Sequence, residues 1–506
     1  MVLVVSLHHG NSNVALLSPS ALSPPLQWRN RCFPLYKHAE RRRSTSITTT
    51  GASISQVHNY DGAMDYETRP MMSWKGVCKK ISSMEKPELG AGIVLTECAR
   101  DGKKLTRWEL FKVIKELRKY KRYNQALEVF EWMNSRDGRY QLSVSNVAIQ
   151  LDLIAKVKGI AVAEQFFEDI SSTLKDGRVY GALLNCYVRG RMLEKSEALI
   201  ETMRSKGFAT QALTFNVMMT LYMNLKQHEK VEQMISEMID RNVPLDIYSY
   251  NIWLSSRGSE GSAEKMEQVF ERMVRDETIN PNWSTFTSMA TMYVKIGEIE
   301  KAEDCLRKAE ERMTGRERIP YHYLISLYGN CGNKEEIYRV WGIYKAAFQT
   351  IPNMGYHSLI SSLVRNGDIE GAEKMYEEWL LSKPTYDPRI ANLLMGFHAK
   401  QGDVEKAEKL LEHISEMGGN PTSHTWEILA EANITKRQLA EAMGYLEKAF
   451  EVADKSKGWK LKRGTLSSFL SLCEEEDDVV DGKEGLIRLC RQAGYLEDDG
   501  YKPLIS

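Results

Sequence analysis

The chain has 506 residues, with 68 Lys and Arg against 68 Asp and Glu, so its formal net charge at pH 7 is zero. This balance differs from the strongly basic footprint of a generic nucleic-acid binder. No apolar run approaches the roughly 20 residues that cross a bilayer, which excludes a membrane span. The eight cysteines form no Cys-x-x-Cys pair, which predicts free thiols in a reducing compartment.

The first 60 residues differ in composition from the rest of the chain. They hold six Lys or Arg against one acid, Glu40, and are rich in Ser and Thr. Such a start is typical of an organelle transit peptide, which we predict over 1–60. The first 28 residues carry no charged side chain, which favours the chloroplast, with the mitochondrion as the alternative. A secretory signal fits less well, because the apolar run Val2–Val5 follows no basic region and breaks at His8–Gly10.

Residues 61–106 are predicted to form an N-terminal helical cap. The part from 72 to 104 holds two short amphipathic stretches that lack the regular period of the chain that follows. Terminal units of a repeat array need a polar outer face, so an atypical first unit is expected.

Four glycines then recur 35 residues apart in similar surroundings: Gly297, Gly332, Gly367 and Gly402. A period of this size is typical of stacked helical pairs, which work through an extended surface and not through a single pocket. The second helix of each pair carries a residue, small in most units, that is followed four and seven positions later by apolar ones. This column contains Ala126, Ala163, Ser196, Val231, Met266, Ala302, Ile337, Ala372, Ala407 and Ala442. Each glycine is expected to close the first helix in a left-handed conformation.

The chain ends in a degenerate final repeat, predicted over 458–506. A helical pattern continues there around an acidic insertion, Glu474–Asp478 with Asp481. Positions 1–60 carry a net charge of +5, so the remainder carries −5, and this insertion holds six of its acids. The repeat body is therefore near neutral.

Segments 213–238, 248–273 and 355–379 closely resemble the pattern of pentatricopeptide repeats. The Trp…Leu-Gly…Tyr set of tetratricopeptide repeats, which have a similar period, is absent. The resemblance covers ten repeats within 107–457, and segment 108–133 is similar to the first repeat of a plant organellar subgroup with plain repeats only. It implies an all-α fold, a right-handed superhelical α-solenoid of helix-turn-helix repeats.

Members of this family read single-stranded RNA one base per repeat, through the fifth and the last residue of each unit. The resemblance assigns the fifth positions to Phe111, Ala148, Gly181, Asn216, Asn251, Thr287, His322, His357, Asn392 and Glu427. It assigns the last positions to Ser143, Asp176, Gln211, Asp246, Asn282, Glu317, Pro352, Asp387, Thr422 and Lys457.

Four of these pairs are candidate base readers. Asn216 with Asp246 resembles a uridine reader, and Asn251 with Asn282 a cytidine or uridine reader. Asn392 with Thr422 favours a pyrimidine, whereas Thr287 with Glu317 departs from the purine pairs. An amide donates to and accepts from a base edge, and a carboxylate orients the amide. The competing interpretation of the asparagines is polarity at a helix N-terminus.

The thirteenth residue of six units is a cation and a candidate phosphate contact: Lys119, Lys156, Arg189, Lys295, Arg365 and Lys400. A cation near a helix C-terminus also stabilises the helix dipole, so this column supports RNA binding only in part. In the first repeat Lys112, Lys115, Lys119 and Arg122 form one basic helix face, for which a merely solvated surface is the alternative.

The sequence contains no phosphate-binding glycine loop, no deaminase signature and no acidic nuclease site, so we expect neither an enzyme nor a cofactor or small-molecule substrate. His322 and His357 occupy equivalent positions in adjacent repeats; we expect them to be surface histidines and not a metal pair. The predicted function is sequence-selective binding of single-stranded organellar RNA, in processing, stability or translation. The alternative is an adaptor that binds other RNA-processing or ribosomal proteins, or structured rRNA.

Overall fold

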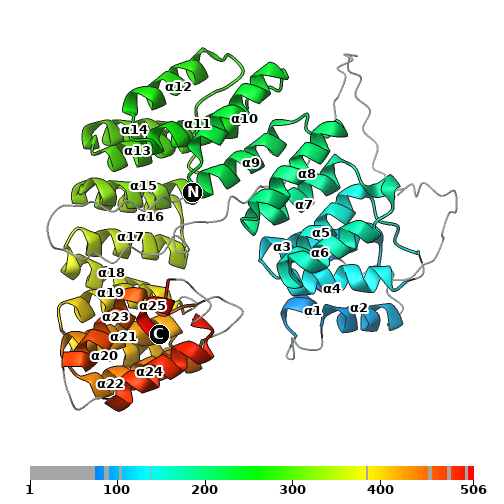
Figure 1. The fold of residues 1–506 in the computed structure, drawn as a ribbon. Coiled ribbons are helices and arrows are strands. Elements are labelled where there is room, and N and C mark those ends of the chain that lie inside the picture. The colour runs from blue at the N-terminus through cyan, green and yellow to red at the C-terminus, as the bar shows by residue number, and fades with distance from the viewer. Residues whose placement is uncertain are drawn as a thin grey trace, which may run out of the picture. The chain divides into compact units, whose positions relative to one another are not determined.

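The computed structural model describes residues 74–84, 90–101, 105–136, 138–382, 386–453, 459–475, 480–495 and 500–505. Within these ranges the regular elements are all helical (Figure 1). The chain divides into two compact units, Met1–Ala209 and Thr210–Ser506. The predicted transit peptide lies outside the described residues.

The described residues of the first unit form four helical hairpins. Helix α1 packs on α3 and α2 on α4, so the predicted cap is itself a hairpin stacked on the first repeat. The helices are α1 (Trp74–Ser82), α2 (Ala91–Arg100), α3 (Arg107–Lys119), α4 (Tyr123–Asn134), α5 (Val144–Val157), α6 (Ile160–Asp169), α7 (Gly177–Arg189) and α8 (Leu193–Ser205). A short 3-10 turn, Ser172–Leu174, joins α6 to α7.

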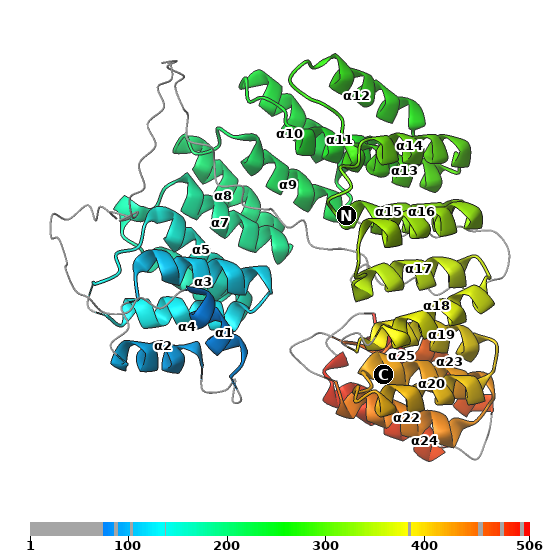
Figure 2. The same ribbon diagram turned by 180° about the vertical axis from the view of Figure 1, so that it is seen from behind.

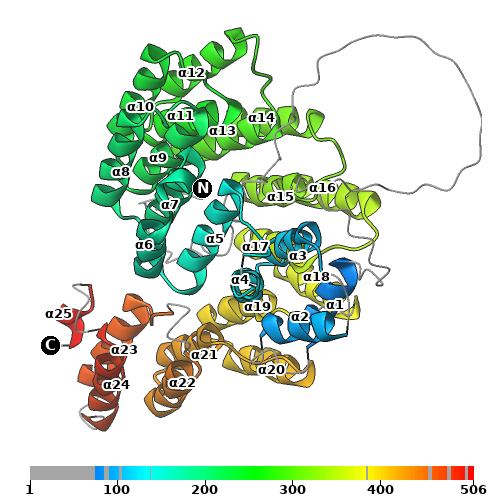
Figure 3. The same ribbon diagram turned by 90° about the vertical axis from the view of Figure 1, so that its right-hand side faces the viewer.

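The second unit contains the remaining hairpins. First helices of neighbouring hairpins pack together, as α11 does on α13 and α15 on α17 (Figures 2 and 3). The helices are α9 (Ala212–Asn224), α10 (His228–Asp240), α11 (Ile247–Ser259), α12 (Ala263–Arg275), α13 (Trp283–Ile296), α14 (Ile299–Glu311), α15 (Ile319–Cys331), α16 (Lys334–Ala347), α17 (Asn353–Arg365), α18 (Ile369–Leu381), α19 (Pro388–Lys400), α20 (Val404–Glu416), α21 (Ser423–Thr435), α22 (Leu439–Glu451), α23 (Arg463–Glu475), α24 (Val480–Gln492) and α25 (Lys502–Ile505).

The packing column predicted on the second helices is confirmed. All ten members, from Ala126 to Ala442, have no exposed surface. Seven positions further on, nine of the ten side chains are also buried, and only Ile170 is half-buried. A small residue lets the paired helix approach closely, and the larger residues then fill the space between hairpins. The described structure is thus an all-α solenoid of helical pairs within each unit.

The turn inside each of the ten repeats contains one left-handed residue. Gly297, Gly332, Gly367 and Gly402 have φ of 93°, 81°, 73° and 74°, as the sequence predicted. The same turn position is left-handed in other repeats without glycine: Lys121, Arg191, Lys226 and Arg437 have φ between 55° and 62°. The turn geometry is therefore more regular than the glycine pattern that first indicated it.

Tyrosines on the first helices tie neighbouring hairpins together. Tyr293 Oη donates to Glu267 Oε1 of the preceding hairpin at 2.8 Å, and Lys301 Nζ lies 3.1 Å from the same oxygen. These hydrogen bonds hold the pKa of Glu267 below its ordinary value. One carboxylate thus joins helices of two hairpins, which restrains how adjacent repeats are stacked.

Candidate nucleic-acid interface

The last position of each repeat lies at the start of the next first helix. The first backbone N–H groups of a helix have no partner inside the helix. A polar side chain at this N-cap position can accept hydrogen bonds from them. Eight of the ten predicted last residues are N-cap residues: Ser143, Asp176, Gln211, Asp246, Asn282, Pro352, Asp387 and Thr422. Glu317 directly precedes the N-cap Arg318, and Lys457 lies outside the described residues.

Asn216 and Asp246 are joined directly. Asn216 Nδ2 donates to Asp246 Oδ1 at 2.9 Å, and Ser249 Oγ donates to Asn216 Oδ1 at 2.8 Å. The same Asp246 oxygen caps α11 by accepting from the backbone N–H of Ser249 at 2.8 Å. Asn216 is completely buried, so the surrounding protein fixes the orientation of its amide. One of its two amide N–H groups donates to Asp246, and the other bonds neither Asp246 nor Ser249.

Asn251 and Asn282 are connected through Ser284. Asn251 Nδ2 donates to Ser284 Oγ at 3.2 Å, and this hydroxyl donates to Asn282 Oδ1 at 2.7 Å. Asn282 also caps α13. Asn251 Oδ1 is buried and has no hydrogen-bond partner. A buried acceptor without a partner costs roughly 1–3 kcal/mol, which a donor on an incoming ligand would offset.

The other two predicted pairs are arranged differently. Asn392 is buried, its Oδ1 has no partner, and no hydrogen bond joins it to Thr422, which forms a capping box with Thr425. Thr287 is also buried, and its hydroxyl donates to the Ser284 carbonyl at 3.2 Å. The pair of Asn392 and Thr422 therefore does not repeat the direct link between Asn216 and Asp246.

Two of the last residues are neutralised by arginines that the repeat pattern did not single out. Asp176 pairs with Arg178 at 2.6 Å, and Asp387 pairs with Arg389 at the same distance. Each arginine lies two positions after its aspartate. That spacing is the sequence signal by which these ion pairs could have been found, because both residues belong to one first turn.

The expectation of surface histidines is wrong for His357. Its side chain is only 3% exposed and its Nδ1 is buried without a partner. His322 is half-buried, and its Nε2 lies 2.9 Å from Tyr344 Oη. Burial lowers the pKa of both histidines to about 4, so both are neutral at pH 7. No group of three or more His, Cys, Asp or Glu side chains suited to a metal occurs in the described part of the chain.

The tenth repeat carries a buried carboxylate at its fifth position. Glu427 is 1% exposed, and its Oε1 accepts from the backbone N–H of Lys462 at 2.8 Å. The residues just before α23 therefore cover this fifth side chain. Sequence alone did not reveal this, because the contact joins residues 35 positions apart.

All six cations of the thirteenth column lie in the last turn of a first helix. Some of them are already paired. Asp152 Oδ2 lies 2.6 Å from Lys156 and 3.5 Å from Arg118, and its Oδ1 lies 3.1 Å from Arg189. Burial and the nearby Lys226 lower the pKa of Lys295 to about 8. The positive charge of the column is thus weaker than its residue count indicates.

The basic face of α3 is more accessible. Trp108 is 61% exposed, and Lys112 Nζ lies 5.1 Å from the centre of its ring. Lys115 and Lys119 are exposed, and Lys119 pairs with Glu116 at 3.3 Å. Cations interleaved with exposed aromatic rings suit unpaired nucleic acid, since bases stack on the rings and phosphates meet the cations.

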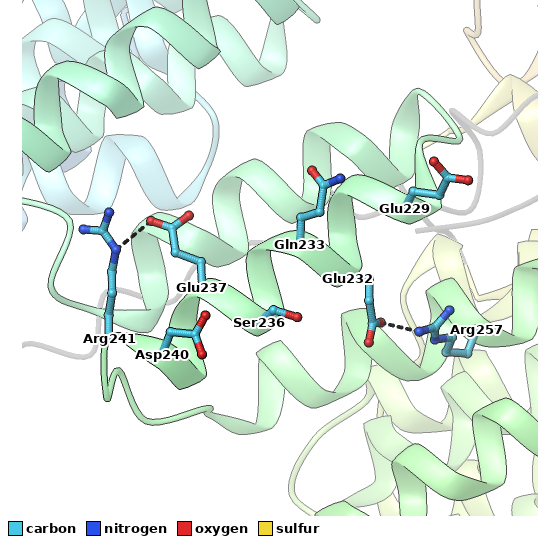
Figure 4. Close-up of a pocket in the computed structure, with 8 residues that line it drawn as sticks. All are labelled: Glu229, Glu232, Gln233, Ser236, Glu237, Asp240, Arg241 and Arg257. Atoms are coloured by element: carbon cyan, nitrogen blue, oxygen red, sulfur yellow. Dashed lines mark ion pairs between the residues drawn. The ribbon is translucent and has the colours of Figure 1, made fainter.

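A pocket of about 680 Å³ lies on α10 of the second unit (Figure 4). Four acids line it, and its two arginines are already paired, Arg241 with Glu237 at 2.9 Å and Arg257 with Glu232 at 2.7 Å. This surface repels a phosphate backbone, so it takes no part in the candidate RNA interface. None of the described helices is both long and apolar enough to cross a bilayer.

Stacked helical pairs with columns of polar and cationic residues define a helical-repeat protein with an extended binding surface. A model described as "PPR repeat" matches residues 178–208, 248–277, 284–312, 356–382 and 390–419, and one described as "PPR repeat family" matches 210–256. A pentatricopeptide repeat-containing protein of Arabidopsis thaliana is 60% identical over 98% of this chain and 93% of its own length. The chain belongs to the pentatricopeptide repeat family.

Two further Arabidopsis thaliana proteins differ in what their names state. A mitochondrial pentatricopeptide repeat-containing protein is 34% identical over 85% of this chain and 87% of its own length. The large ribosomal subunit protein mL101 is 41% identical over 81% of this chain and 84% of its own length.

Proposed function

We propose that the chain is a sequence-selective single-stranded RNA-binding protein that acts in RNA processing, stability or translation. The observation that carries this proposal is the pair of neighbouring polar sites in the fourth and fifth repeats. Asn251 is half-buried and is held by Ser284 with its Oδ1 unpartnered. Asn216 is oriented by Asp246 and fully buried, so a base reaches it only after its neighbours move. Oriented amides of this kind discriminate between base edges by ~1–3 kcal/mol per good contact.

The proposed compartment is an organelle. The Arg- and Ser-rich first 60 residues support import, and one relative is named as mitochondrial. The choice between chloroplast and mitochondrion is tested by incubating the full chain with both isolated organelles. Protection from protease in only one of them identifies the compartment, and protection in neither contradicts the organellar assignment.

A second function, as an adaptor within an organellar ribosome, is supported by the 41% identity to a large ribosomal subunit protein. The near-neutral repeat body and the cations already paired with Asp152 also suit this function. An adaptor would bind a protein surface or folded rRNA and would show little preference among unpaired sequences.

Binding to a pool of random unpaired RNA distinguishes the two functions. If all six cations of the thirteenth column meet phosphates, the slope of log K against log salt approaches about −4. Replacing Asn216 and Asn251 by Ala should weaken only sites that contain the matching pyrimidines. Asn366→Ala is the control, because this amide also bridges two repeats but lies outside the reading positions. A slope near zero contradicts direct RNA binding, and equal loss for every sequence contradicts base reading.

A further inference from the structure

A second pocket, of about 320 Å³, lies in the first unit, where α1 packs against the C-terminal end of α3. Its volume is at the lower end of the range for small-ligand sites. Its α1 side belongs to the N-terminal cap and not to the ten repeats. None of the predicted reading residues lines it. The lining residues are Trp74, Lys75, Cys78, Lys79, Ser82, Glu116, Leu117, Tyr120 and Arg122.

The pocket has a surplus of positive charge. Lys75, Lys79 and Arg122 line it against a single acid, Glu116, which already pairs with Lys119 at 3.3 Å. Among the described residues no carboxylate lies within ion-pair distance of the three lining cations. Within the described residues these cations therefore have no carboxylate partner, and an anion would satisfy them.

Aromatic rings accompany these cations. Tyr120 is 64% exposed and Trp74 is half-buried, and both line the same pocket. A bare phosphate or an acidic side chain would use the cations but leave the rings unused. A nucleotide uses both, since its base stacks on an aromatic face while its phosphate meets the cations.

The pocket continues the basic face of α3. The face leads along α3 from the exposed Trp108 through Lys112 and Lys115 to Lys119. Arg122, which was predicted on the same face, instead lies beyond α3 as the N-cap of α4 and lines the pocket. Lys112 and Lys115 are likewise without a carboxylate in ion-pair range within the described residues. An RNA strand that follows this face would arrive at the pocket with its backbone on the cations.

We propose that this pocket binds one unpaired nucleotide of an RNA strand, beside the first repeat and without regard to base identity. The inference rests on the proposed RNA-binding function and extends it. The pocket adds affinity, whereas the residues of the fourth to ninth repeats add sequence preference. The two contributions can therefore be separated experimentally.

Lys79→Ala and Lys80→Ala form a matched pair in the full-length chain, because both lysines are exposed on α1 but only Lys79 lines the pocket. At 0.1 M salt, loss of one phosphate contact on a single strand weakens binding about fivefold and makes the salt slope shallower by about 0.7. We expect this for Lys79→Ala with every sequence tested, and no change for Lys80→Ala. Tyr120→Ala should weaken binding about tenfold with an unchanged salt slope, because stacking is not ionic.

Cys78 provides a readout that does not depend on the repeats. Its alkylation rate, measured by peptide mass spectrometry, should fall in the presence of a phosphorylated dinucleotide but not of inorganic phosphate, with Cys331 as the internal reference. If the chain binds long RNA but the Lys79 and Lys80 variants behave alike and Cys78 is unprotected, the pocket proposal is wrong and the proposed function stands. If the chain binds no long RNA, the protection of Cys78 by the dinucleotide still tests whether the pocket binds a nucleotide.

Discussion

Individual charged residues differ widely in how far their charge remains available to a ligand. In the thirteenth column, two of the six cations share the single charge of Asp152, and burial lowers the pKa of Lys295. Asp176 and Asp387 are engaged by arginines, whereas Asp246 is bonded to the asparagine that it is predicted to orient. The residue type thus sets which interactions a side chain can make. Its neighbours determine which of these interactions remain available to a ligand.

Lys295 provides a test of the phosphate-contact hypothesis by pH. Its pKa is lowered to about 8, first by burial and then by Lys226, so the charged form is lost as the pH rises through 8. RNA binding at constant ionic strength should therefore weaken between pH 7 and pH 9. Lys295→Arg keeps its charge in this range and should retain most of its affinity. A parallel decline of both proteins would show that Lys295 meets no phosphate.

Asp152→Asn should strengthen RNA binding. The amide keeps the shape of the side chain but removes the charge that holds Lys156, Arg189 and Arg118. Each cation that then meets a phosphate makes the salt slope steeper by about 0.7. Asp304→Asn is the control, because that carboxylate pairs with Lys308 on a second helix at 2.6 Å, away from the column. Unchanged affinity for Asp152→Asn would argue against phosphate contacts at these positions.

At the scale of the helices, the hairpin is the repeated element, and its turn is the feature conserved in shape between units. The left-handed turn residue occurs with and without glycine, so the period of the array does not depend on glycine. Glycine lowers the conformational cost of the turn, since this backbone conformation costs other residues roughly 1–2 kcal/mol.

Substitutions at glycines should therefore have opposite effects in turns and in helices. Gly297→Ala should destabilise by about 1 kcal/mol, because φ is 93° and a Cβ would meet no atom within 4 Å, so the cost is purely conformational. Gly444→Ala, in the interior of α22 with equally open space, should stabilise by roughly 0.5–1 kcal/mol. Arg191→Gly, at a turn with φ of 55°, should also stabilise. Denaturant midpoints for the three variants test these signs.

At the scale of the whole molecule, the two compact units carry different parts of the candidate interface. The eight predicted reading residues all lie between 216 and 422, in the second unit. The nucleotide pocket, the basic face of α3 and three of the six column cations belong to the first unit. We thus assign sequence preference to the second unit, and general affinity for RNA mainly to the first unit.

A fragment of residues 210–506 should keep the base preference of the full chain while binding more weakly. Stacked repeats depend mainly on their nearest neighbours, so the fragment is expected to stay helical by circular dichroism. Loss of Lys119, Lys156 and Arg189, together with the phosphate contact of the pocket, should make the salt slope shallower by about 3. A folded fragment with altered base preference would contradict the assignment of the reading positions to the second unit.

The amino-acid sequence by itself determined the helical hairpins, their period and their packing column. These follow from local spacing, because residues four and seven apart share a helix face whatever lies elsewhere in the chain. Base-reading candidates could be placed in the chain for the same reason, as positions within a unit. Their function in RNA binding remains a prediction.

Only the tertiary structure decided which polar groups are free. Asn216 is bonded to Asp246 while Asn251 keeps an unpartnered oxygen, His357 is buried, and Glu427 is covered by the backbone before α23. These outcomes depend on contacts between residues about 30 to 35 positions apart, whose geometry is set by the stacking of one hairpin on the next. A repeat pattern specifies that two hairpins meet, but hydrogen bonds depend on distances of a few tenths of an ångström, which the pattern does not contain.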